Sequence, residues 1–422
     1  MKGHGVILFP MPFQGHINPM FQLANILHAK GFSITIIHTQ FNSPNPSNYP
    51  HFRFYSIPDG LSENHAVPSD LNHIVTLLTT LNSNCVTSFR DCLAKLLSVN
   101  LEDHIACLIT DALWHFTQAV ADGLKLPRIV LRTSNVSSFL VFTYMPFLCE
   151  KGYLSAQDSQ AENQVPELPQ LKFKDIVMFE RGDLGRLRQF IAIVVQETKA
   201  SSGIIWNSYE DLEQEHLTKC SLYFSIPVFP IGPFHKCFPA SSSSLLPQDQ
   251  SCISWLDKQA PNSVIYVSFG SVAAINETEF LEIAWGLANS NQPFLWVVRP
   301  RLVHGSEWLE LLPNGFLEMV GERAYIVKWA PQQEVLAHPS TGGFWTHCGW
   351  NSTLESLCEG VPMICRPSFA GPGRIMQVCK PCFGELGLPS GIQVGRGEIE
   401  RAIRRLNGGE AEGQEMRSES CD

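Results

Sequence analysis

The chain has 422 residues, of which 44% are hydrophobic, and it carries a formal net charge of −10 at pH 7. A hydrophobic fraction of this size supports a large buried core, and the length corresponds to two or three domains, which excludes a disordered or low-complexity chain. Because 40 acidic residues outnumber 30 basic ones, nucleic acid and an acidic membrane face are excluded as main partners.

The thirteen cysteines are odd in number and follow no regular spacing, and the chain does not open with a secretory signal. The most apolar later stretch, residues 139–149, has about half the length that a membrane-spanning helix needs. We therefore expect a cytoplasmic protein with reduced cysteines and no membrane span.

The first half of the chain alternates short apolar runs with helical spacing, which is typical of α/β proteins. Residues 6–9, 33–38 and 105–110 indicate buried parallel strands, and Asp111 stands at the end of the last one. Asn18 followed by Pro19 predicts the cap and the first position of a helix after the first strand.

A Pro- and Ser-rich stretch over residues 227–247 interrupts this pattern and indicates a linker. Further strands are expected at residues 264–269, 294–298, 325–327, 343–346 and 363–365. Asn276 and Glu279 can cap the helix that follows the first of these strands. The expected segments are an N-terminal domain (1–235), a linker (236–250), a C-terminal domain (251–406) and a short polar tail (407–422).

These elements predict two tandem, doubly wound α/β domains. Ligands of such sheets bind outside the carboxyl ends of the strands. His16 and Asp111 lie just past strand ends in the first half, and Ser271 and His347 do so in the second. We therefore expect the two domains to face each other across a cleft that holds the functional site.

Several common motifs are absent from the sequence. It has no Gly-x-x-x-x-Gly-Lys-[Ser/Thr] loop, no Gly-x-Ser-x-Gly elbow and no His-Glu-x-x-His helix. The nearest Gly-x-Gly-x-x-Gly, which begins at Gly371, has Pro372 at the tight turn and Met376 in place of the third glycine. These observations disfavour a P-loop NTPase, an α/β-hydrolase, a zinc peptidase and a dinucleotide oxidoreductase.

One long segment is far more specific than these motifs. Residues 329–372 read WAPQQEVLAHPSTGGFWTHCGWNSTLESLCEGVPMICRPSFAGP. This box resembles the donor-binding signature of the plant family-1 UDP-dependent glycosyltransferases, and so do PMPFQGHINPMFQLANIL, CLITDALW, YVSFGS and FLWVVRP elsewhere in the chain. The resemblance implies the GT-B arrangement of two facing Rossmann-like domains, an acceptor-binding N-terminal one and a UDP-sugar-binding C-terminal one.

The resemblance also implies the chemistry. Members of the family transfer a sugar, most often glucose, from a UDP-sugar to a hydroxyl group of a small lipophilic plant metabolite, with inversion and without a metal or cofactor. The acceptor pocket is expected in the first domain, where Phe13, Trp114, Phe139 and Phe142 are candidates as either lining or core.

The resemblance also implies which residues of the box bind the UDP-sugar donor. Gly349 leads into a helix start, and the N–H groups of such a start bind a diphosphate well. By resemblance, Trp329 stacks on the uracil, Gln332 meets its edge and Glu355 accepts both ribose hydroxyls. The phosphates are held by His347, Asn351, Ser352 and Ser271, and Trp350 lines the sugar pocket.

His16 and Asp111 are the expected catalytic pair. An imidazole can take the proton of the acceptor hydroxyl near neutral pH, and a carboxylate behind the ring fixes its tautomer. The charge of the leaving group is then carried by the helix start and His347.

The box departs from the family at its end. The family has an acidic residue and a glutamine there, which contact the sugar hydroxyls, whereas this chain has Gly371 and Pro372. Residues 373–390 continue the departure, and the match returns at about residue 391. Two alternatives to an active transferase therefore stay open: an impaired relative that binds UDP but transfers sugar poorly, and a carrier of a lipophilic ligand without chemistry.

Overall fold

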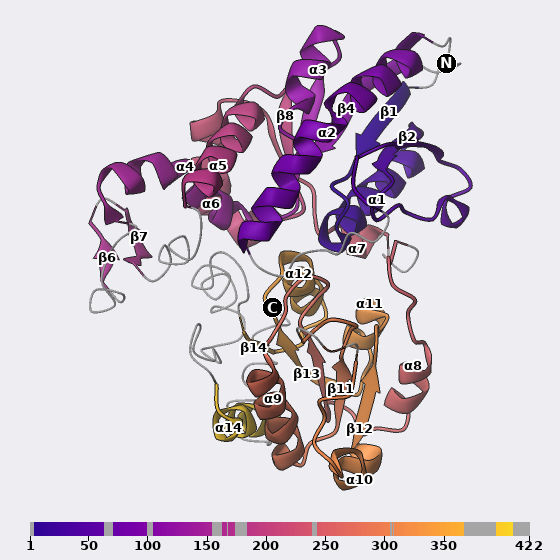
Figure 1. Cartoon of the computed structure of the whole chain (residues 1–422), viewed down its shortest axis with the longest axis vertical. Coiled ribbons are helices and arrows are strands. Elements are labelled where there is room, and N and C mark those ends of the chain that lie inside the picture. The colour runs from indigo at the N-terminus through magenta and orange to yellow at the C-terminus, as the bar shows by residue number, and fades with distance from the viewer. Residues whose placement is uncertain are drawn as a thin grey trace. The chain divides into compact units, whose positions relative to one another are not determined.

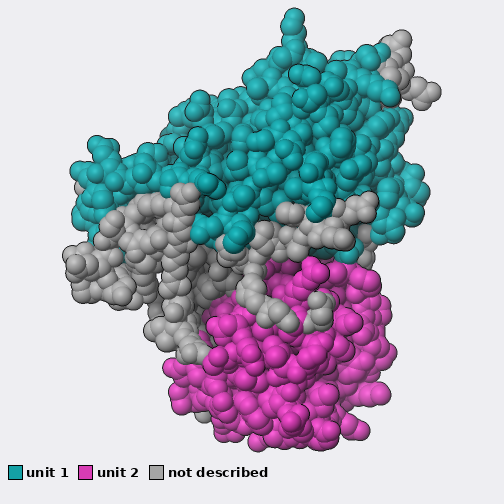
Figure 2. Space-filling view, in the orientation of Figure 1, with its two compact units in different colours: residues 1–245 teal, residues 246–422 magenta. Residues whose placement is uncertain are grey.

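The computed structural model describes residues 4–62, 71–98, 104–153, 163–166, 168–173, 184–238, 243–303, 306, 308–366 and 394–407. The chain divides into two compact units, residues 1–245 and 246–422 (Figure 2). The segment boundaries predicted at residues 235, 250 and 406 stay predictions. Gly371, Pro372 and the tail from residue 408 onward lie outside the described residues.

A seven-stranded parallel sheet forms the centre of the first unit, in the order β3-β2-β1-β4-β5-β8-β9. Figure 1 labels β1, β2, β4 and β8 of this sheet. Its strands are β1 (His4–Phe9), β2 (Ser33–Thr39), β3 (Arg53–Ile57), β4 (His104–Asp111), β5 (Arg128–Arg132), β8 (Gly203–Trp206) and β9 (Val228–Pro230). The three strands predicted in this half are therefore confirmed as β1, β2 and β4.

Helices connect these strands, as the parallel direction of the sheet requires. They are α1 (Gln14–Ala29), α2 (Leu71–Ser98), α3 (Thr117–Gly123), α4 (Val136–Glu150), α5 (Leu184–Lys199), α6 (Glu210–Phe224) and α7 (Phe234–Cys237), with a short 3₁₀ turn at Pro46–Asn48. A separate antiparallel pair is formed by β6 (Gln164–Val165) and β7 (Leu168–Lys172).

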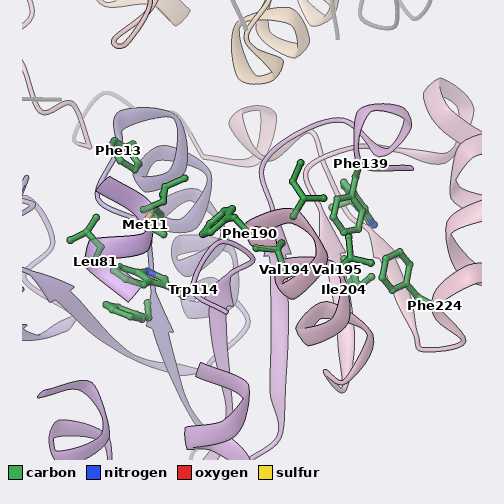
Figure 3. Packing of buried hydrophobic residues seen from close by; sticks show 14 of the residues in the cluster. Met11, Phe13, Leu81, Trp114, Phe139, Phe190, Val194, Val195, Ile204 and Phe224 are labelled. Atoms are coloured by element: carbon green, nitrogen blue, oxygen red, sulfur yellow. The ribbon is translucent and has the colours of Figure 1, made fainter. Parts of the chain in front are cut away.

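The sheet of the first unit is buried on both faces. Along β1, Ile7 and Phe9 belong to one hydrophobic cluster, whereas Val6 and Leu8 belong to another, because successive strand residues point to opposite faces. The first cluster is dominated by aromatic and aliphatic side chains (Figure 3). Within it Phe9 stacks on Trp114 at 4.5 Å between ring centroids.

Two of the candidate acceptor-pocket residues are core residues. Trp114 and Phe139 have no solvent-exposed surface. The indole N–H of Trp114 donates to the carbonyl of Pro10 at 3.0 Å, and the Phe139 ring lies under the Arg132 guanidinium at 4.0 Å. Packing therefore accounts for both rings.

The predicted start of the first helix is wrong. Helix α1 begins at Gln14, with the carbonyl of Phe13 accepting from the N–H groups of His16 and Ile17 at 2.9 Å each. Pro19 is consequently an interior residue of α1, where it removes one backbone donor. The Asn18 side chain does not cap the helix, because it accepts hydrogen bonds from Gln14 and Ser243.

The second unit contains a five-stranded parallel sheet in the order β12-β11-β10-β13-β14. Its strands are β10 (Val264–Ser268), β11 (Phe294–Val297), β12 (Ala324–Val327), β13 (Thr341–Thr346) and β14 (Met363–Cys365). Its helices are α8 (Ser251–Leu256), α9 (Glu277–Ser290), α10 (Phe316–Val320), α11 (Gln332–Leu336), α12 (Trp350–Cys358) and α14 (Arg396–Asn407), with a 3₁₀ turn at Gly321–Arg323. All five predicted strands of this half are confirmed.

Close packing of α14 closes one face of this unit. An added Cβ at Gly343 would lie 2.2 Å from Leu406, and one at Gly286 would lie 2.5 Å from Ile399. A Cβ at either position would therefore force the Leu406 or Ile399 side chain of α14 to shift. The predicted cap of α9 is confirmed, since the Asn276 side chain accepts from the Glu279 N–H at 2.8 Å.

Both sheets reverse their strand order beside their first strand. The reversal lies between β1 and β4 in the first unit and between β10 and β13 in the second. Such a switch point opens a crevice at the carboxyl ends of the two strands, where ligands bind. The predicted doubly wound, Rossmann-like α/β architecture is thus present in each unit. Among the described helices, none combines the length and the apolar character needed to cross a bilayer.

Candidate active site

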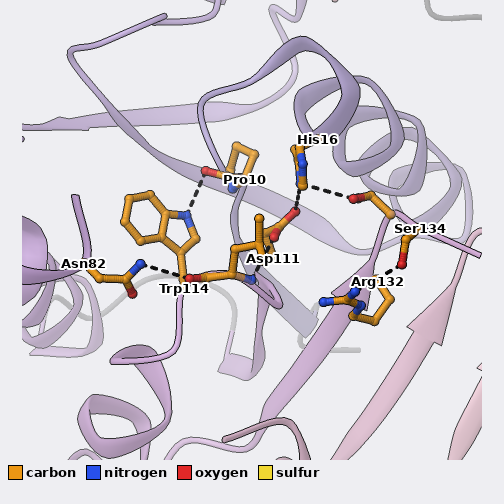
Figure 4. A network of polar contacts seen from close by, with 9 residues as sticks. Pro10, His16, Asn82, Asp111, Trp114, Arg132 and Ser134 are labelled. Carbon is orange, nitrogen blue, oxygen red and sulfur yellow. Dashed lines mark hydrogen bonds and ion pairs between the residues drawn. The ribbon is translucent and has the colours of Figure 1, made fainter. Parts of the chain in front are cut away.

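The switch point of the first unit carries a histidine–aspartate pair. His16 lies in the first turn of α1, directly after β1, and Asp111 is the last residue of β4. The Nδ1 atom of His16 is 2.6 Å from Oδ2 of Asp111 (Figure 4). The structure therefore brings together the two residues that the sequence predicted as a pair.

The surroundings of Asp111 determine which imidazole nitrogen is basic. Its side chain is 2% exposed, whereas that of His16 is 24% exposed. The other carboxylate oxygen, Oδ1, accepts from the N–H of Leu113 at 2.9 Å. An ionised carboxylate accepts hydrogen bonds only, so Nδ1 of His16 carries the proton and Nε2 has the available lone pair.

A threonine and an arginine that the sequence did not single out complete this site. The Oγ1 of Thr133 lies 3.1 Å from Nδ1 of His16. Arg132, which ends β5, is buried and donates to Oγ of Ser134 at 3.1 Å. Burial lowers the pKa of the Arg132 guanidinium to about 10, and nearby Asp111 acts in the opposite direction. Both residues sit at the carboxyl end of the strand beside β4, which is the signal that could have found them.

In the second unit, the ring of His347 lies between two glycines. The residue follows β13 directly, and an added Cβ at Gly270 would lie 2.5 Å from the ring. An added Cβ at Gly349 would lie 2.4 Å from Nε2 of the same ring. The two glycines therefore make the space that the imidazole fills at the switch point between β10 and β13.

The environment of His347 keeps its imidazole neutral. Burial lowers its pKa to about 4, and the positive charges of Arg299 and Arg366 act in the same direction. Arg299 also braces the loop after β10, since it donates to the carbonyls of Gly270 at 3.0 Å and of Ala273. At neutral pH His347 thus presents one N–H donor and one lone pair.

Helix α12 begins immediately after this histidine. Gly349 is its N-cap residue, and Trp350, Asn351 and Ser352 form its first turn. The first turn of a helix directs N–H groups that have no partner within the helix toward its end, where they favour negative charge. Trp350 and Ser352 are buried, and Asn351 is partly buried.

A buried carboxylate lies one turn further along α12. Glu355 is 7% exposed, and its oxygens accept from Nε2 of Gln332 at 2.7 Å and from Nε2 of Gln333 at 2.8 Å. Burial raises the pKa of Glu355, and the two amide donors offset part of that rise. The carboxylate is consequently placed to accept two hydrogen bonds at once.

Gln332 joins this carboxylate to the start of α12. Its amide nitrogen also donates to Oγ of Ser352 at 2.9 Å, and its Oε1 accepts from the hydroxyl of Tyr266 at 3.3 Å. The structure thus brings Gln332, Ser352 and Glu355 into one network, to which Gln333 is an addition that the sequence did not supply. The signal for Gln333 is its position next to Gln332 at the start of α11.

The remaining two predicted donor residues follow strand ends of the second unit. Trp329 is partly buried just after β12, where its carbonyl accepts from the N–H of Asp249 at 2.9 Å. Ser271 is partly buried in the loop after β10, next to Gly270. All eight predicted donor residues therefore lie on the second unit, after strand ends, in the first turns of α11 and α12, or, for Glu355, one turn further along α12. Within the described residues, no cluster of three or more His, Cys, Asp or Glu side chains could hold a metal ion.

Comparison with known proteins identifies the family. The family model for UDP-glucuronosyl and UDP-glucosyl transferases matches residues 59–376. UDP-glycosyltransferase 76B1 of Arabidopsis thaliana is 55% identical over 412 residues, which cover 98% of this chain and 90% of that protein. The chain belongs to the plant family-1 UDP-glycosyltransferases. Its activity is accordingly the transfer of a sugar from a UDP-sugar to an acceptor.

Other relatives of this glycosyltransferase point to glucosylation. The flavonol 3-O-glucosyltransferase UGT76E12 of Arabidopsis thaliana is 44% identical over 420 residues, covering 98% of this chain and 90% of that protein. The DIMBOA UDP-glucosyltransferase BX8 of Zea mays is 40% identical over 428 residues, covering 98% and 92%.

Solved structures support the fold of the glycosyltransferase. The UGT2 of Phytolacca americana, complexed with UDP-2-fluoro-glucose and pterostilbene, superposes with a TM-score of 0.80 at 28% identity and covers 99% of this chain and 93% of that one. A UDP-glucosyltransferase of Polygonum tinctorium, capable of glucosylating indoxyl, gives a TM-score of 0.79 at 29% identity and covers 99% and 92%. The predicted fold class, two Rossmann-like domains as in GT-B enzymes, is confirmed. The cleft expected between them stays a prediction.

Proposed function

We propose that this glycosyltransferase moves glucose, with inversion at the anomeric carbon, from UDP-glucose to a hydroxyl group of a small lipophilic plant metabolite. The observation that carries the proposal is the contact of 2.6 Å between His16 and Asp111, because it supplies a general base with a fixed tautomer. A carrier without chemistry has no use for such a pair.

His16 acts as the general base through Nε2. As the acceptor oxygen attacks the anomeric carbon, its proton passes to Nε2, and the bond between that carbon and the β-phosphate oxygen breaks. The electron pair of the broken bond leaves with UDP. Asp111 stabilises the imidazolium that forms, as the carboxylate of a Ser-His-Asp triad does.

The second unit binds the donor. Trp329 stacks on the uracil, Gln332 meets the edge of the base, and the Glu355 carboxylate accepts the two ribose hydroxyls. The diphosphate lies at the start of α12, held by Asn351, Ser352 and neutral His347, with Ser271 assisting, and Trp350 lines the sugar pocket. The helix start and the His347 N–H stabilise the charge that develops on UDP, so the UDP-sugar is a co-substrate and neither a metal nor a cofactor is needed.

The acceptor belongs to the class of small lipophilic alcohols and phenols. Two named relatives act on a flavonol and on DIMBOA, and one solved neighbour binds pterostilbene. The partly exposed imidazole of His16 is where the acceptor hydroxyl must arrive.

A UDP-release assay tests the proposal. The purified chain is mixed with UDP-glucose and a panel of phenolic and terpenoid alcohols, and UDP and glucoside are quantified together. We expect glucoside and UDP in equal amounts with at least one member of the panel. Release of UDP without glucoside, or carrier-type binding of an acceptor without any turnover, contradicts the proposal.

A second candidate, an impaired transferase that still binds UDP, is favoured by the sequence at Gly371 and Pro372. The loss of two polar contacts to the sugar weakens the alignment of the anomeric carbon. Under this reading, UDP binds in calorimetry while transfer is slow, and the double variant Gly371→Asp with Pro372→Gln raises kcat. An unchanged kcat in that variant rejects this candidate.

The raised pKa of Glu355 makes donor binding depend on pH. The carboxylate accepts the ribose hydroxyls only when it is ionised, so UDP affinity is present above the raised pKa of Glu355 and is lost as the pH falls through it. Glu355→Gln should weaken UDP binding roughly 10- to 100-fold at neutral pH, since a hydrogen bond to a charged group contributes about 1.5–3 kcal/mol. It should also remove this pH dependence.

Calorimetric titration with UDP between pH 4.5 and 7.5 measures both effects. Glu334→Gln, a change at an exposed carboxylate on α11, is the matched control and should bind like the wild type. Titration with 2′-deoxy-UDP separates the contact between Glu355 and the ribose from a general effect of removing a negative charge. This ligand lacks one of the two ribose hydroxyls, so its affinity should differ less between Glu355→Gln and the wild type than the affinity for UDP does. Equal weakening for UDP and 2′-deoxy-UDP would show that Glu355 does not bind both hydroxyls.

A further inference from the structure

Three polar side chains tie the end of the first unit to helix α1. Nε2 of Gln14 donates to the carbonyl of Ser243 at 3.1 Å, and Oε1 of Gln14 accepts from the N–H of Leu245 at 2.6 Å. Oδ1 of Asn18 accepts from Nε2 of Gln14 at 2.5 Å and from Oγ of Ser243 at 2.6 Å. We call Gln14, Asn18 and Ser243 the linker clamp.

Two of the three residues of the linker clamp are buried, and Asn18 is partly buried. Gln14 is 7% exposed and Ser243 is 6% exposed. Breaking the hydrogen bonds between them therefore costs free energy, because water does not freely replace the lost partners. The apolar side chain of Leu245 packs against the cluster that contains Ile17 and Phe21 of α1. Residues 243–245 are thus held on α1 by apolar packing as well as by hydrogen bonds.

The linker clamp and the catalytic pair use opposite sides of one helix turn. Gln14 and Asn18 are four residues apart and therefore share a face of α1. His16 lies two residues from each, which corresponds to a rotation of about 200° at 3.6 residues per turn, and it points to Asp111 (Figure 4). A change in the linker clamp therefore touches neither His16 nor Asp111 directly.

We propose that Gln14, Asn18 and Ser243 are positioning residues for the transfer reaction. They anchor the chain, immediately before it passes from Leu245 into the second unit at Leu246, to the same helix turn that presents the base. This proposal rests on the proposed function, in which His16 serves a sugar nucleotide bound by the second unit.

The physical reason is effective concentration. The base and the donor belong to different units of one chain, so the rate of transfer depends on how often the two are aligned. A tether that is anchored near the base restricts the arrangements that the units can explore, whereas a longer free tether dilutes the productive one. Loss of the linker clamp should therefore lower kcat and leave the affinity for UDP unchanged.

Asn18 offers a matched pair of variants. Asn18→Leu removes the acceptor of two hydrogen bonds, whereas Asn18→Asp keeps an oxygen in the same position for both donors. Ser243 lies outside the helices, and Ser243→Ala removes one of these two hydrogen bonds. This variant replaces Asn18→Leu in the test if Asn18→Leu fails to fold.

Two measurements test the proposal. Limited digestion with chymotrypsin follows cleavage after Leu245 and needs no activity, so it separates failure of the clamp from failure of the proposed function. Steady-state kinetics with UDP-glucose then gives kcat, and calorimetry gives the Kd for UDP. We expect faster cleavage and a kcat lowered about ten-fold in Asn18→Leu and in Ser243→Ala, with an unchanged Kd for UDP, and wild-type behaviour in Asn18→Asp.

Three results would overturn the proposal. They are wild-type cleavage and kcat in Asn18→Leu and Ser243→Ala, an Asn18→Asp variant as impaired as Asn18→Leu, and a Kd for UDP that rises in parallel with the loss of kcat. The last result would indicate general damage to the fold instead of lost positioning.

Discussion

His16→Ala should reduce kcat for glucoside formation by roughly 10²- to 10⁴-fold, the usual contribution of a positioned general base. The alanine cannot take the proton of the acceptor hydroxyl. Nδ1 of His16 lies 2.6 Å from Oδ2 of Asp111, and no other described side chain can take over the position of the imidazole. The donor residues lie on the second unit, so the Kd for UDP in calorimetry should not change.

Two further variants sharpen this test. His28→Ala, at the other end of α1, removes an imidazole that stacks on His51 at 4.5 Å between ring centroids and should keep wild-type kcat. Asp111→Asn leaves the size of the side chain unchanged, but the amide does not hold His16 in the tautomer that carries the proton on Nδ1. This variant should therefore lose most of the activity. A His16→Ala enzyme within ten-fold of the wild type would remove His16 from the mechanism.

Gly270→Ala should abolish tight UDP binding and destabilise the second unit. Gly270 has φ = +70°, and its added Cβ would lie 2.5 Å from the ring of His347. The left-handed backbone conformation costs an L-residue about 1–2 kcal/mol, and overpacking adds about 1–3 kcal/mol. Because the imidazole must move away from the start of α12, we expect UDP affinity to fall by about 100-fold or more.

Two other glycines separate the steric effect from the backbone effect. Gly315 has φ = +76° but no atom within 4 Å of its added Cβ, so Gly315→Ala should lower the melting temperature slightly and leave UDP binding intact. Gly349 has φ = −65° and an added Cβ 2.4 Å from His347, so Gly349→Ala should lose UDP binding without the strain. Calorimetry and thermal unfolding of the three variants measure this. Equal UDP affinity in Gly270→Ala and Gly315→Ala would show that the position of His347 is unimportant.

The strands were predictable because burial on both faces selects continuous apolar runs. Residues 6–9 and 264–269 illustrate this, since they became β1 (His4–Phe9) and β10 (Val264–Ser268). The start of α1 was not predictable in this way. Asn18 and Pro19 satisfy the local rules for a helix start, but the hydrogen bonds of Asn18 to Gln14 and Ser243 outweigh that local preference.

The proximity of His16 and Asp111 was predictable from their positions along the chain, because the carboxyl ends of adjacent parallel strands meet at one edge of the sheet. Thr133, which directly follows β5, and Gln333, which is next to Gln332, were missed. Their hydroxyl and amide groups acquire a role only through contacts with His16 and Glu355, which are 117 and 22 residues away. No local pattern encodes a contact at such a separation.

The sequence by itself determined the family, the alternation of strands and helices, and which polar side chains follow strand ends, because these depend on residue type and local spacing. The tertiary structure alone decided that His347 fills the space above two glycines, that Glu355 is buried with a raised pKa, and that residues 243–245 are held on α1. These features arise from packing and desolvation between segments far apart in the chain, and such energies exist only once the segments have come together.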